Sequence, residues 1–237
     1  MEQLKDELKQ KIQQIESVKI KEALSDEVLE GLYSVYPFNK FEYVISHLIS
    51  TGTITLQEYL DIRNQYLQRN KYLYVFEITA PRIFGETWAQ RHLNEVVPEL
   101  QRPTTNIDSK YQGEYDFFYN NIKIEVKASR AVAKIEGPLI EKALSINSNQ
   151  AFDMNFQQLK PYCCDVFVFI AVWKDAIKYW VFSSKEISEN KYFSHGQHRG
   201  NIGEGQLWIK QDNIDYFKQN EATVREILDK ICQASKK

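Results

Sequence analysis

This chain of 237 residues has few cysteines, no net positive charge and few long apolar runs. Its three cysteines, Cys163, Cys164 and Cys232, are too few for a disulfide framework, and no CxxC spacing points to a zinc site. No apolar run reaches transmembrane length, and the N-terminal residues lack the basic start and the apolar block of a signal peptide. We therefore expect a soluble, cytoplasmic protein with no membrane partner.

The charge balance and the composition narrow the class of protein further. A net charge of −2 with a pI near 6.1 is not typical of a nucleic-acid-binding protein, although a basic patch can lie on a chain of neutral overall charge. Aromatic residues make up 13% of the chain, which fits a packed globular protein and excludes a disordered one. The length allows one elaborated domain, or one catalytic domain with a smaller helical extension.

Two short apolar runs, residues 115–119 and 122–128, flank the pair Asn120-Asn121. Both runs are rich in β-branched and aromatic residues, which favour strands, and asparagine tolerates the positive φ angles that a two-residue turn requires. The pattern therefore predicts a β-hairpin with Asn120 and Asn121 as its turn.

This register places Asp116 opposite Glu125 and Tyr115 opposite Val126. Two opposed carboxylates destabilise a sheet unless something offsets their repulsion. Strand alternation puts Lys127 on the same face as Glu125 and turns the apolar residues toward a core. Mg²⁺ prefers hard oxygen ligands, commonly one or two carboxylates with water and substrate phosphate, so this face is what a metal site with an adjacent ammonium group would look like. The alternative is a solvated face on which Glu114 pairs with Lys127 across the strands.

Apolar periodicity predicts that the first third of the chain is helical. We expect residues 1–72 to form a helical region that covers one face of a sheet, with dimerisation or DNA contact as alternatives. Its expected helices are residues 2–16, residues 25–32, a helix capped by Asn39 with Phe41, Val44, Ile45 and Leu48 buried, and a helix that begins at the capping box of Thr55 and Glu58.

Strands and helices alternate in the remainder, residues 73–237. Besides the hairpin, we expect strands at residues 72–78, 165–173, 176–182 and 206–210, and helices at residues 85–97, 153–159 and 220–231, the last capped by Asn220. The run 165–173 is apolar almost throughout, which is typical of a strand buried on both faces at the centre of a sheet. Residues 194–205 are rich in glycine and predict a loop.

The order of these features resembles the PD-(D/E)xK nuclease core of type II restriction endonucleases. The resemblance spans residues 85–173 and comprises a helix with Glu86, Asp116, the triplet Glu125-Val126-Lys127, a later helix and a buried strand. Tyr115 stands where the motif's name has proline, and the family's first core strand would be short or lie within residues 104–111.

The resemblance implies an α/β (α+β) fold with a mixed central sheet flanked by helices, that is, a restriction-endonuclease-like core with the N-terminal helical region attached. Residues 73–237 would form the catalytic domain, including a DNA-contacting loop and helix near its C-terminus. The implied activity is Mg²⁺-dependent cleavage of double-stranded DNA at a short specific sequence by a homodimer, leaving 5′-phosphate and 3′-hydroxyl ends. The alternatives are a repair or recombination nuclease that recognises DNA structure, and a non-catalytic DNA-binding protein on the same scaffold.

The resemblance also implies residue roles. Asp116 and Glu125 would bind Mg²⁺, with the carbonyl of Val126 as a further ligand, and Lys127 would orient or activate the attacking water. Glu86 matches an acidic residue that such enzymes often carry on the preceding helix; the alternative is an ordinary acid in a first helical turn.

Contacts with DNA are expected from two segments. Ser129, Arg130 and Lys134 follow Lys127 closely enough to meet phosphates near the scissile bond. The glycine-rich loop carries side chains able to contact bases or phosphates, with a plain polar surface loop as the alternative. These loop candidates are His195, Gln197, His198, Arg199 and Asn201.

Overall fold

The structure is a computed structural model and describes residues 36–196 and 204–237. Contacts between Cα atoms divide the chain into two compact units, residues 1–56 and 57–237. The predicted division at residue 72 falls inside the second unit and remains a prediction. The helices expected at residues 2–16 and 25–32 lie outside the described residues. Within the described part, no helix combines the length and apolarity needed to cross a membrane.

Two of the expected N-terminal helices are present. Helix α4 (Glu42–Ser50) begins after Phe41, which occupies the N-cap position in place of the expected Asn39. No residue of α4 is buried, and Phe41 and Val44 are each 51% exposed, so the expected buried stripe is wrong. Helix α5 (Leu56–Arg69) begins directly after Thr55, as its capping-box sequence predicts.

A mixed five-stranded sheet lies at the centre of the second unit. Only β2 and β5 run parallel; the other neighbouring pairs are antiparallel. The predicted hairpin is confirmed, because Phe117 pairs with Ile124 and the turn residues Asn120 and Asn121 have φ angles of 46° and 62°. In sheet order the strands are β1 (Phe117–Tyr119), β2 (Ile122–Arg130), β5 (Val166–Val172), β6 (Ile177–Ser183) and β9 (Glu221–Ala222).

A second sheet of four antiparallel strands includes a segment that the sequence analysis assigned to a helix. The prediction of a helix at residues 153–159 is wrong. Phe152, Met154 and Phe156 are buried and alternate with partly exposed polar residues, a period of two that belongs to a strand. In sheet order the strands are β3 (Val132–Ala133), β4 (Phe152–Leu159), β8 (Gly205–Lys210) and β7 (Phe193–His195).

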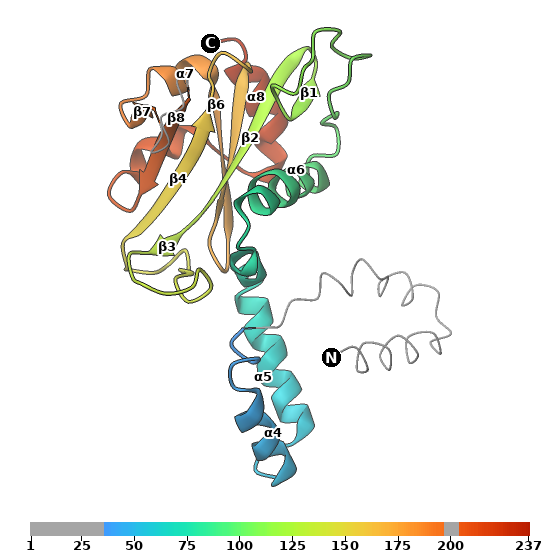
Figure 1. The fold of residues 1–237 in the computed structure, drawn as a ribbon, viewed down its shortest axis with the longest axis vertical. Helices are drawn as coiled ribbons and strands as arrows, with labels where there is room; N and C mark the ends of the chain where they lie inside the picture. The colour runs from blue at the N-terminus through green and yellow to red at the C-terminus, as the bar shows by residue number, and fades with distance from the viewer. Residues whose placement is uncertain (1–35, 197–203) are drawn as a thin grey trace. The chain divides into compact units, whose positions relative to one another are not determined.

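The two faces of the central sheet are covered differently (Figure 1). One face packs against a π-helix, η2 (Ile83–Trp88), and against α6 (Ala89–Val96) and α8 (Ile227–Ala234). The other face packs against the second sheet, where the rings of Phe156 and Phe169 stack with centroids 4.4 Å apart. The α/β prediction is thus confirmed, with the refinement that the second sheet covers one of the two faces, together with Ile187 and Phe217. The chain also passes from β2 to β5 through β3 and β4, and not through the helix that the resemblance implied.

Strand β5 is buried along its whole length, as predicted for a central strand. Val168 and Ile170 face the helices, whereas Phe167 and Phe169 face the second sheet. Its alternating side chains therefore join the two apolar cores.

Two other predictions are wrong. Residues 72–78 form no strand but a 3₁₀ helix, η1 (Leu73–Glu77), whose buried residues Leu73, Val75 and Phe76 are not spaced by two. Residues 104–111 contain turns and no strand; among the described residues before β1, only an isolated bridge from Gln101 to Phe118 extends the sheet.

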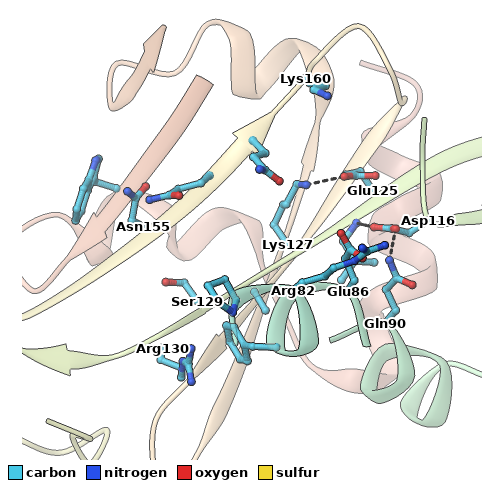
Figure 2. Close-up of a pocket in the computed structure, with 18 of the residues that line it drawn as sticks. Arg82, Glu86, Gln90, Asp116, Glu125, Lys127, Ser129, Arg130, Asn155 and Lys160 are labelled. Carbon is cyan, nitrogen blue, oxygen red and sulfur yellow. Dashed lines mark hydrogen bonds and ion pairs between the residues drawn. The ribbon is translucent and has the colours of Figure 1, made fainter. Parts of the chain in front are cut away.

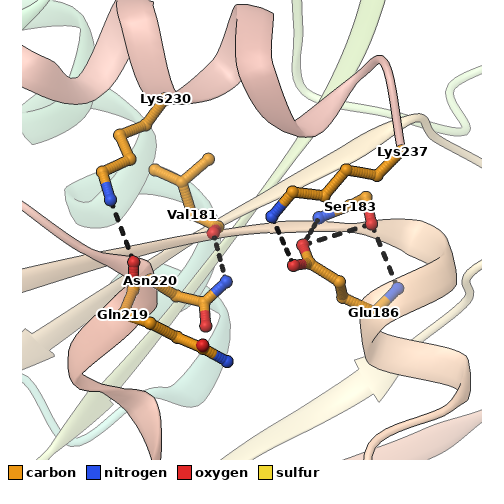
Figure 3. A network of polar contacts seen from close by, with 7 residues as sticks. All are labelled: Val181, Ser183, Glu186, Gln219, Asn220, Lys230 and Lys237. Atoms are coloured by element: carbon orange, nitrogen blue, oxygen red, sulfur yellow. Dashed lines mark hydrogen bonds and ion pairs between the residues drawn. The ribbon is translucent and has the colours of Figure 1, made fainter.

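The C-terminal helix begins later than predicted. Asn220 does not cap it but ends a 3₁₀ helix, η3 (Ile214–Asn220), and donates a side-chain hydrogen bond of 3.1 Å to the carbonyl of Val181 (Figure 3). Thr223 forms the cap through a capping box with Glu226, which leads through η4 (Val224–Glu226) into α8.

Polar contacts fasten the chain end to the central sheet (Figure 3). Ser183, the last residue of β6, forms a capping box with Glu186 at the start of α7 (Ser184–Ser188). Lys237 places its Nζ 2.6 Å from Oε1 of Glu186, and Lys230 of α8 donates to the carbonyl of Gln219 at 2.9 Å. These contacts hold α8 against β6 of the central sheet.

Candidate active site

A cleft of about 1360 Å³ runs along β2 and is lined by residues of η2, α6, β2, β3 and β4 (Figure 2). It brings together Glu86, Asp116, Glu125, Val126, Lys127, Ser129, Arg130 and Lys134. His195 lies on β7, is exposed and is not among the lining residues. The other loop candidates, Gln197, His198, Arg199 and Asn201, lie outside the described residues.

Asp116 lies at a bend just before β1, where the predicted register ends. Tyr115 is buried on the side of the second sheet and Phe117 on the side of the helices, so the chain does not continue as a regular strand through Asp116. The expected pairing of Tyr115 with Val126 is therefore wrong. Instead, Oδ2 of Asp116 accepts a hydrogen bond of 2.8 Å from the backbone N–H of Val126. The carboxylate thus accepts the hydrogen bond that a backbone carbonyl of a paired strand would otherwise accept.

Glu125 and Lys127 project from the polar face of β2, as predicted. Nζ of Lys127 lies 2.7 Å from Oε1 of Glu125, and the two side chains are only 18% and 17% exposed. The alternative pairing of Lys127 with Glu114 is not formed, since the Glu114 carboxylate accepts a hydrogen bond from the backbone N–H of Gln112.

The electrostatics of Asp116 fit a cation site. Burial, followed by the negative charge of Glu125, raises the pKa of Asp116 to about 7, against the opposing effects of the Val126 N–H and Lys127. Two carboxylates therefore repel each other in a place that water screens poorly. A divalent cation between them would remove that repulsion, and hard oxygen donors are the ligands that Mg²⁺ prefers.

The donor set is small. The described residues contain no cluster of three or more His, Cys, Asp or Glu side chains arranged to hold a metal. Asp116, Glu125 and the Val126 carbonyl would supply the protein ligands, which suits Mg²⁺ because it commonly keeps several waters and substrate phosphate oxygens.

The preceding helix contributes a residue that the sequence analysis missed. The side-chain amide of Gln90 donates to Oδ1 of Asp116, and the guanidinium of Arg102 donates to Oε1 of Gln90. Glu86, one turn earlier, lines the cleft but pairs with Arg82 at 2.7 Å and is 59% exposed, so its role as a metal ligand remains a prediction. Glu86 is distinguished in the sequence by its charge, whereas Gln90 is neutral and is identified only by its contact with Asp116.

Arg130 has structural partners. Its guanidinium donates to the carbonyls of Val75 and Ile78 at 3.0 and 2.6 Å and lies 4.0 Å from the ring centroid of Phe84. Burial lowers its pKa to about 10. Arg130 therefore holds the segment around η1 against β2, and DNA contact by this residue remains a prediction.

Basic side chains surround the carboxylates in the cleft, although the whole chain has a net charge of −2. The same lining carries five acidic residues, and four of the basic side chains are paired with carboxylates, so the cleft is mixed in charge. The basic residues that line the cleft are Arg82, Lys127, Arg130, Lys134, Lys142 and Lys160.

No model of a known protein family matches this chain, and neither does any curated protein. The resemblance to PD-(D/E)xK nucleases therefore rests on the hairpin and its side chains.

Proposed function

We propose that this protein is a Mg²⁺-dependent endonuclease that cleaves double-stranded DNA at a short specific sequence. One observation carries the proposal: the carboxylate of Asp116 is hydrogen-bonded to the backbone N–H of Val126, the residue between Glu125 and Lys127. Asp116 thereby lies beside the backbone that carries Glu125 and Lys127, whose side chains form an ion pair, and all three residues line one large cleft.

Each side chain has a chemical task in phosphodiester hydrolysis. Asp116 and Glu125, with the carbonyl of Val126, would hold Mg²⁺. When bound, the metal supplies a water of lowered pKa and polarises the phosphoryl oxygen. Lys127 has three ammonium donors and uses one on Glu125, which leaves donors to orient the attacking water and to stabilise negative charge on the phosphate. The products would carry 5′-phosphate and 3′-hydroxyl ends.

The cleft suits a polyanionic substrate larger than a nucleotide. It extends from the helix residue Arg82 past the three site residues to Lys160, which follows β4. Lysines on both sides of the carboxylates would contact successive phosphates, which fix a duplex in position without reading its sequence. A homodimer would present two such sites to a palindromic sequence.

Plasmid digestion tests the proposal. We expect the wild-type protein with Mg²⁺ to produce discrete fragments whose mapped ends carry 5′-phosphates, and we expect Asp116→Asn, Glu125→Gln and Lys127→Gln to abolish or severely reduce cleavage. Lys123→Gln is a matched control, because Lys123 lies on the same face of β2 but pairs with Asp108 and does not line the cleft.

Three outcomes would redirect the proposal. Cleavage confined to junctions or flaps would favour a structure-specific repair nuclease. Binding without cleavage in Mg²⁺ or Mn²⁺ would favour a non-catalytic DNA-binding protein. Wild-type activity in both the Asp116 and the Lys127 variants would remove these residues from the reaction.

A further inference from the structure

A β-bulge in β4 turns two consecutive glutamines toward the cleft. The pairing of β4 with β8 is regular from Asp153 to Phe156 and resumes with Leu159 opposite Gly205. Gln157 and Gln158, between these points, are both exposed and both line the cleft. In an unbroken strand their side chains would point to opposite faces, so the extra residue re-aims one of them.

The bulge requires an unusual backbone conformation. Gln158 has φ = 56°, in the left-handed region of backbone conformation that residues other than Gly, Asn and Asp rarely adopt. Glycine would take this conformation without steric strain. A glutamine here is therefore unfavourable for the fold alone, and strain of this kind clusters at functional sites.

A third amide and an aromatic ring continue this surface. Asn155 lines the cleft and donates to Oε1 of Gln206 on β8 at 2.9 Å, while its own Oδ1 is buried without a hydrogen-bond partner among the described residues. Trp208 of β8 pairs with Asn155 in the ladder and also lines the cleft. The cleft-facing side of the β4–β8 ribbon is thus rich in neutral amides.

Lysines lie at both ends of this amide row. Lys134, just after β3, pairs with Asp153 at 3.1 Å, and Lys160 follows directly after β4 and pairs with Glu204 at 2.8 Å. Lysine ammonium groups commonly contact phosphates, and the amides of glutamine can read base edges. The arrangement is therefore one of amides in the middle and a lysine–carboxylate ion pair at either end.

We propose that Gln157 and Gln158 contact base edges of duplex DNA in the major groove and determine which sequence this protein prefers. The inference rests on the proposed function, since it requires duplex DNA in the cleft. A glutamine amide can donate to and accept from the major-groove edge of adenine at once. With a rise of about 3.3 Å per strand residue, the adjacent residues 157 and 158 are separated by about one base step. The preference should therefore include at least one A·T pair among the one or two positions that these glutamines contact.

Selection from a randomised duplex library tests the inference. The full-length protein is incubated with the library in Ca²⁺, and the bound DNA is sequenced, for the wild type, Gln157→Ala and Gln158→Gly. We expect the wild type to enrich one motif. In each variant the discrimination at one or two positions should fall by about 5- to 150-fold, the range for losing one bidentate amide–base contact. The salt dependence of binding should be unchanged, because it counts phosphate contacts. Gln233→Ala, an exposed glutamine on α8, is the matched control and should keep the wild-type motif.

Enrichment of no motif, or the same motif at wild-type sharpness in both variants, would overturn the inference. The enriched motif and the cleavage activity are separate measurements, so they distinguish the base-reading inference from the proposed function. If the protein fails to cleave in Mg²⁺ or Mn²⁺ while Gln157→Ala and Gln158→Gly still change the motif in Ca²⁺, the proposed catalysis is wrong and the base-reading role stands. If cleavage is site-specific and both variants cut the wild-type site with unchanged preference, the reverse holds.

Discussion

Gln90 fixes one oxygen of the Asp116 carboxylate while the backbone of Val126 fixes the other. Arg102 in turn holds the amide of Gln90, and its guanidinium lies 4.4 Å from the ring centroid of Phe117. The carboxylate is therefore restrained from both sides, as the partners of metal ligands commonly are. We assign Gln90 the role of a positioning residue, because its amide donates to the Asp116 carboxylate.

Replacing Gln90 should weaken the binding of Mg²⁺. Loss of a hydrogen bond to a metal ligand typically lowers metal affinity or activity by about 10- to 100-fold, and we expect an effect of this size for Gln90→Leu. The measurement is the Mg²⁺ concentration needed for half-maximal cleavage. Arg91→Leu, which removes an exposed side chain of the same helix, is the control. An unchanged Mg²⁺ dependence in Gln90→Leu would contradict the positioning role.

Metal-free protein should become less stable as the pH rises through the titration of Asp116. Its folded pKa of about 7 lies above the ordinary Asp value near 3.8, so the folded state binds the extra proton between about pH 4 and pH 7. Stability from this group is present at low pH and is lost as the pH rises through 7. In EDTA, this group alone should lower the free energy of unfolding by about 2 kcal/mol between pH 5.5 and pH 7.5.

Asp116→Asn provides the comparison for that measurement, because the amide does not titrate. The difference in unfolding free energy between wild type and variant, from urea titrations at several pH values, isolates the contribution of Asp116. Saturating Mg²⁺ should restore the free energy of unfolding that the wild-type protein loses at pH 7.5, because Mg²⁺ binds the deprotonated carboxylate. A pH-independent difference between the two proteins would contradict the raised pKa.

Arg130→Met should destabilise the protein before any DNA is added. The substitution leaves the carbonyls of Val75 and Ile78 without their donors, and hydrogen bonds from a charged group contribute about 1.5–3 kcal/mol each to stability. We expect a loss of at least about 2 kcal/mol in chemical unfolding. Arg225→Met, on the short helix η4 before α8, is the control. A loss no greater than that of the control would contradict the structural role of Arg130 and leave DNA contact as its only proposed role.

Substitution by glycine at the two bulge positions should have opposite effects on stability. Gln158→Gly relieves a left-handed conformation and should stabilise the fold by up to about 1 kcal/mol. Gln157→Gly weakens a strand without relieving strain and should destabilise the fold by about 0.5–1 kcal/mol. Thermal unfolding of both variants checks this, and equal destabilisation would contradict it.

Local signals in the sequence were sufficient where one segment determines its own structure. Asn120-Asn121 specifies a turn whatever surrounds it, and the apolar run 165–173 can be satisfied only in a sheet interior. Strand β4 was missed because the consecutive polar residues Gln157 and Gln158 interrupt its alternation, and the bulge that accommodates them exists only in pairing with β8. The contact of Gln90 with Asp116 joins positions 26 residues apart, and no local pattern marks it.

The parallel pairing of β2 with β5 also constrains how the protein folds. Residues 131–165 lie between these strands, and they include β3 and β4, which belong to the other sheet. Strand β2, which carries Glu125 and Lys127, therefore pairs along its second edge only after a long loop closes. Closing a long loop costs conformational entropy and is typical of late folding events. A nascent chain that has not yet reached β5 would contain every proposed catalytic residue but not the fully paired strand that holds them. Substitutions that weaken either core should then lower the fraction of active molecules and leave the rate of each correctly folded molecule unchanged.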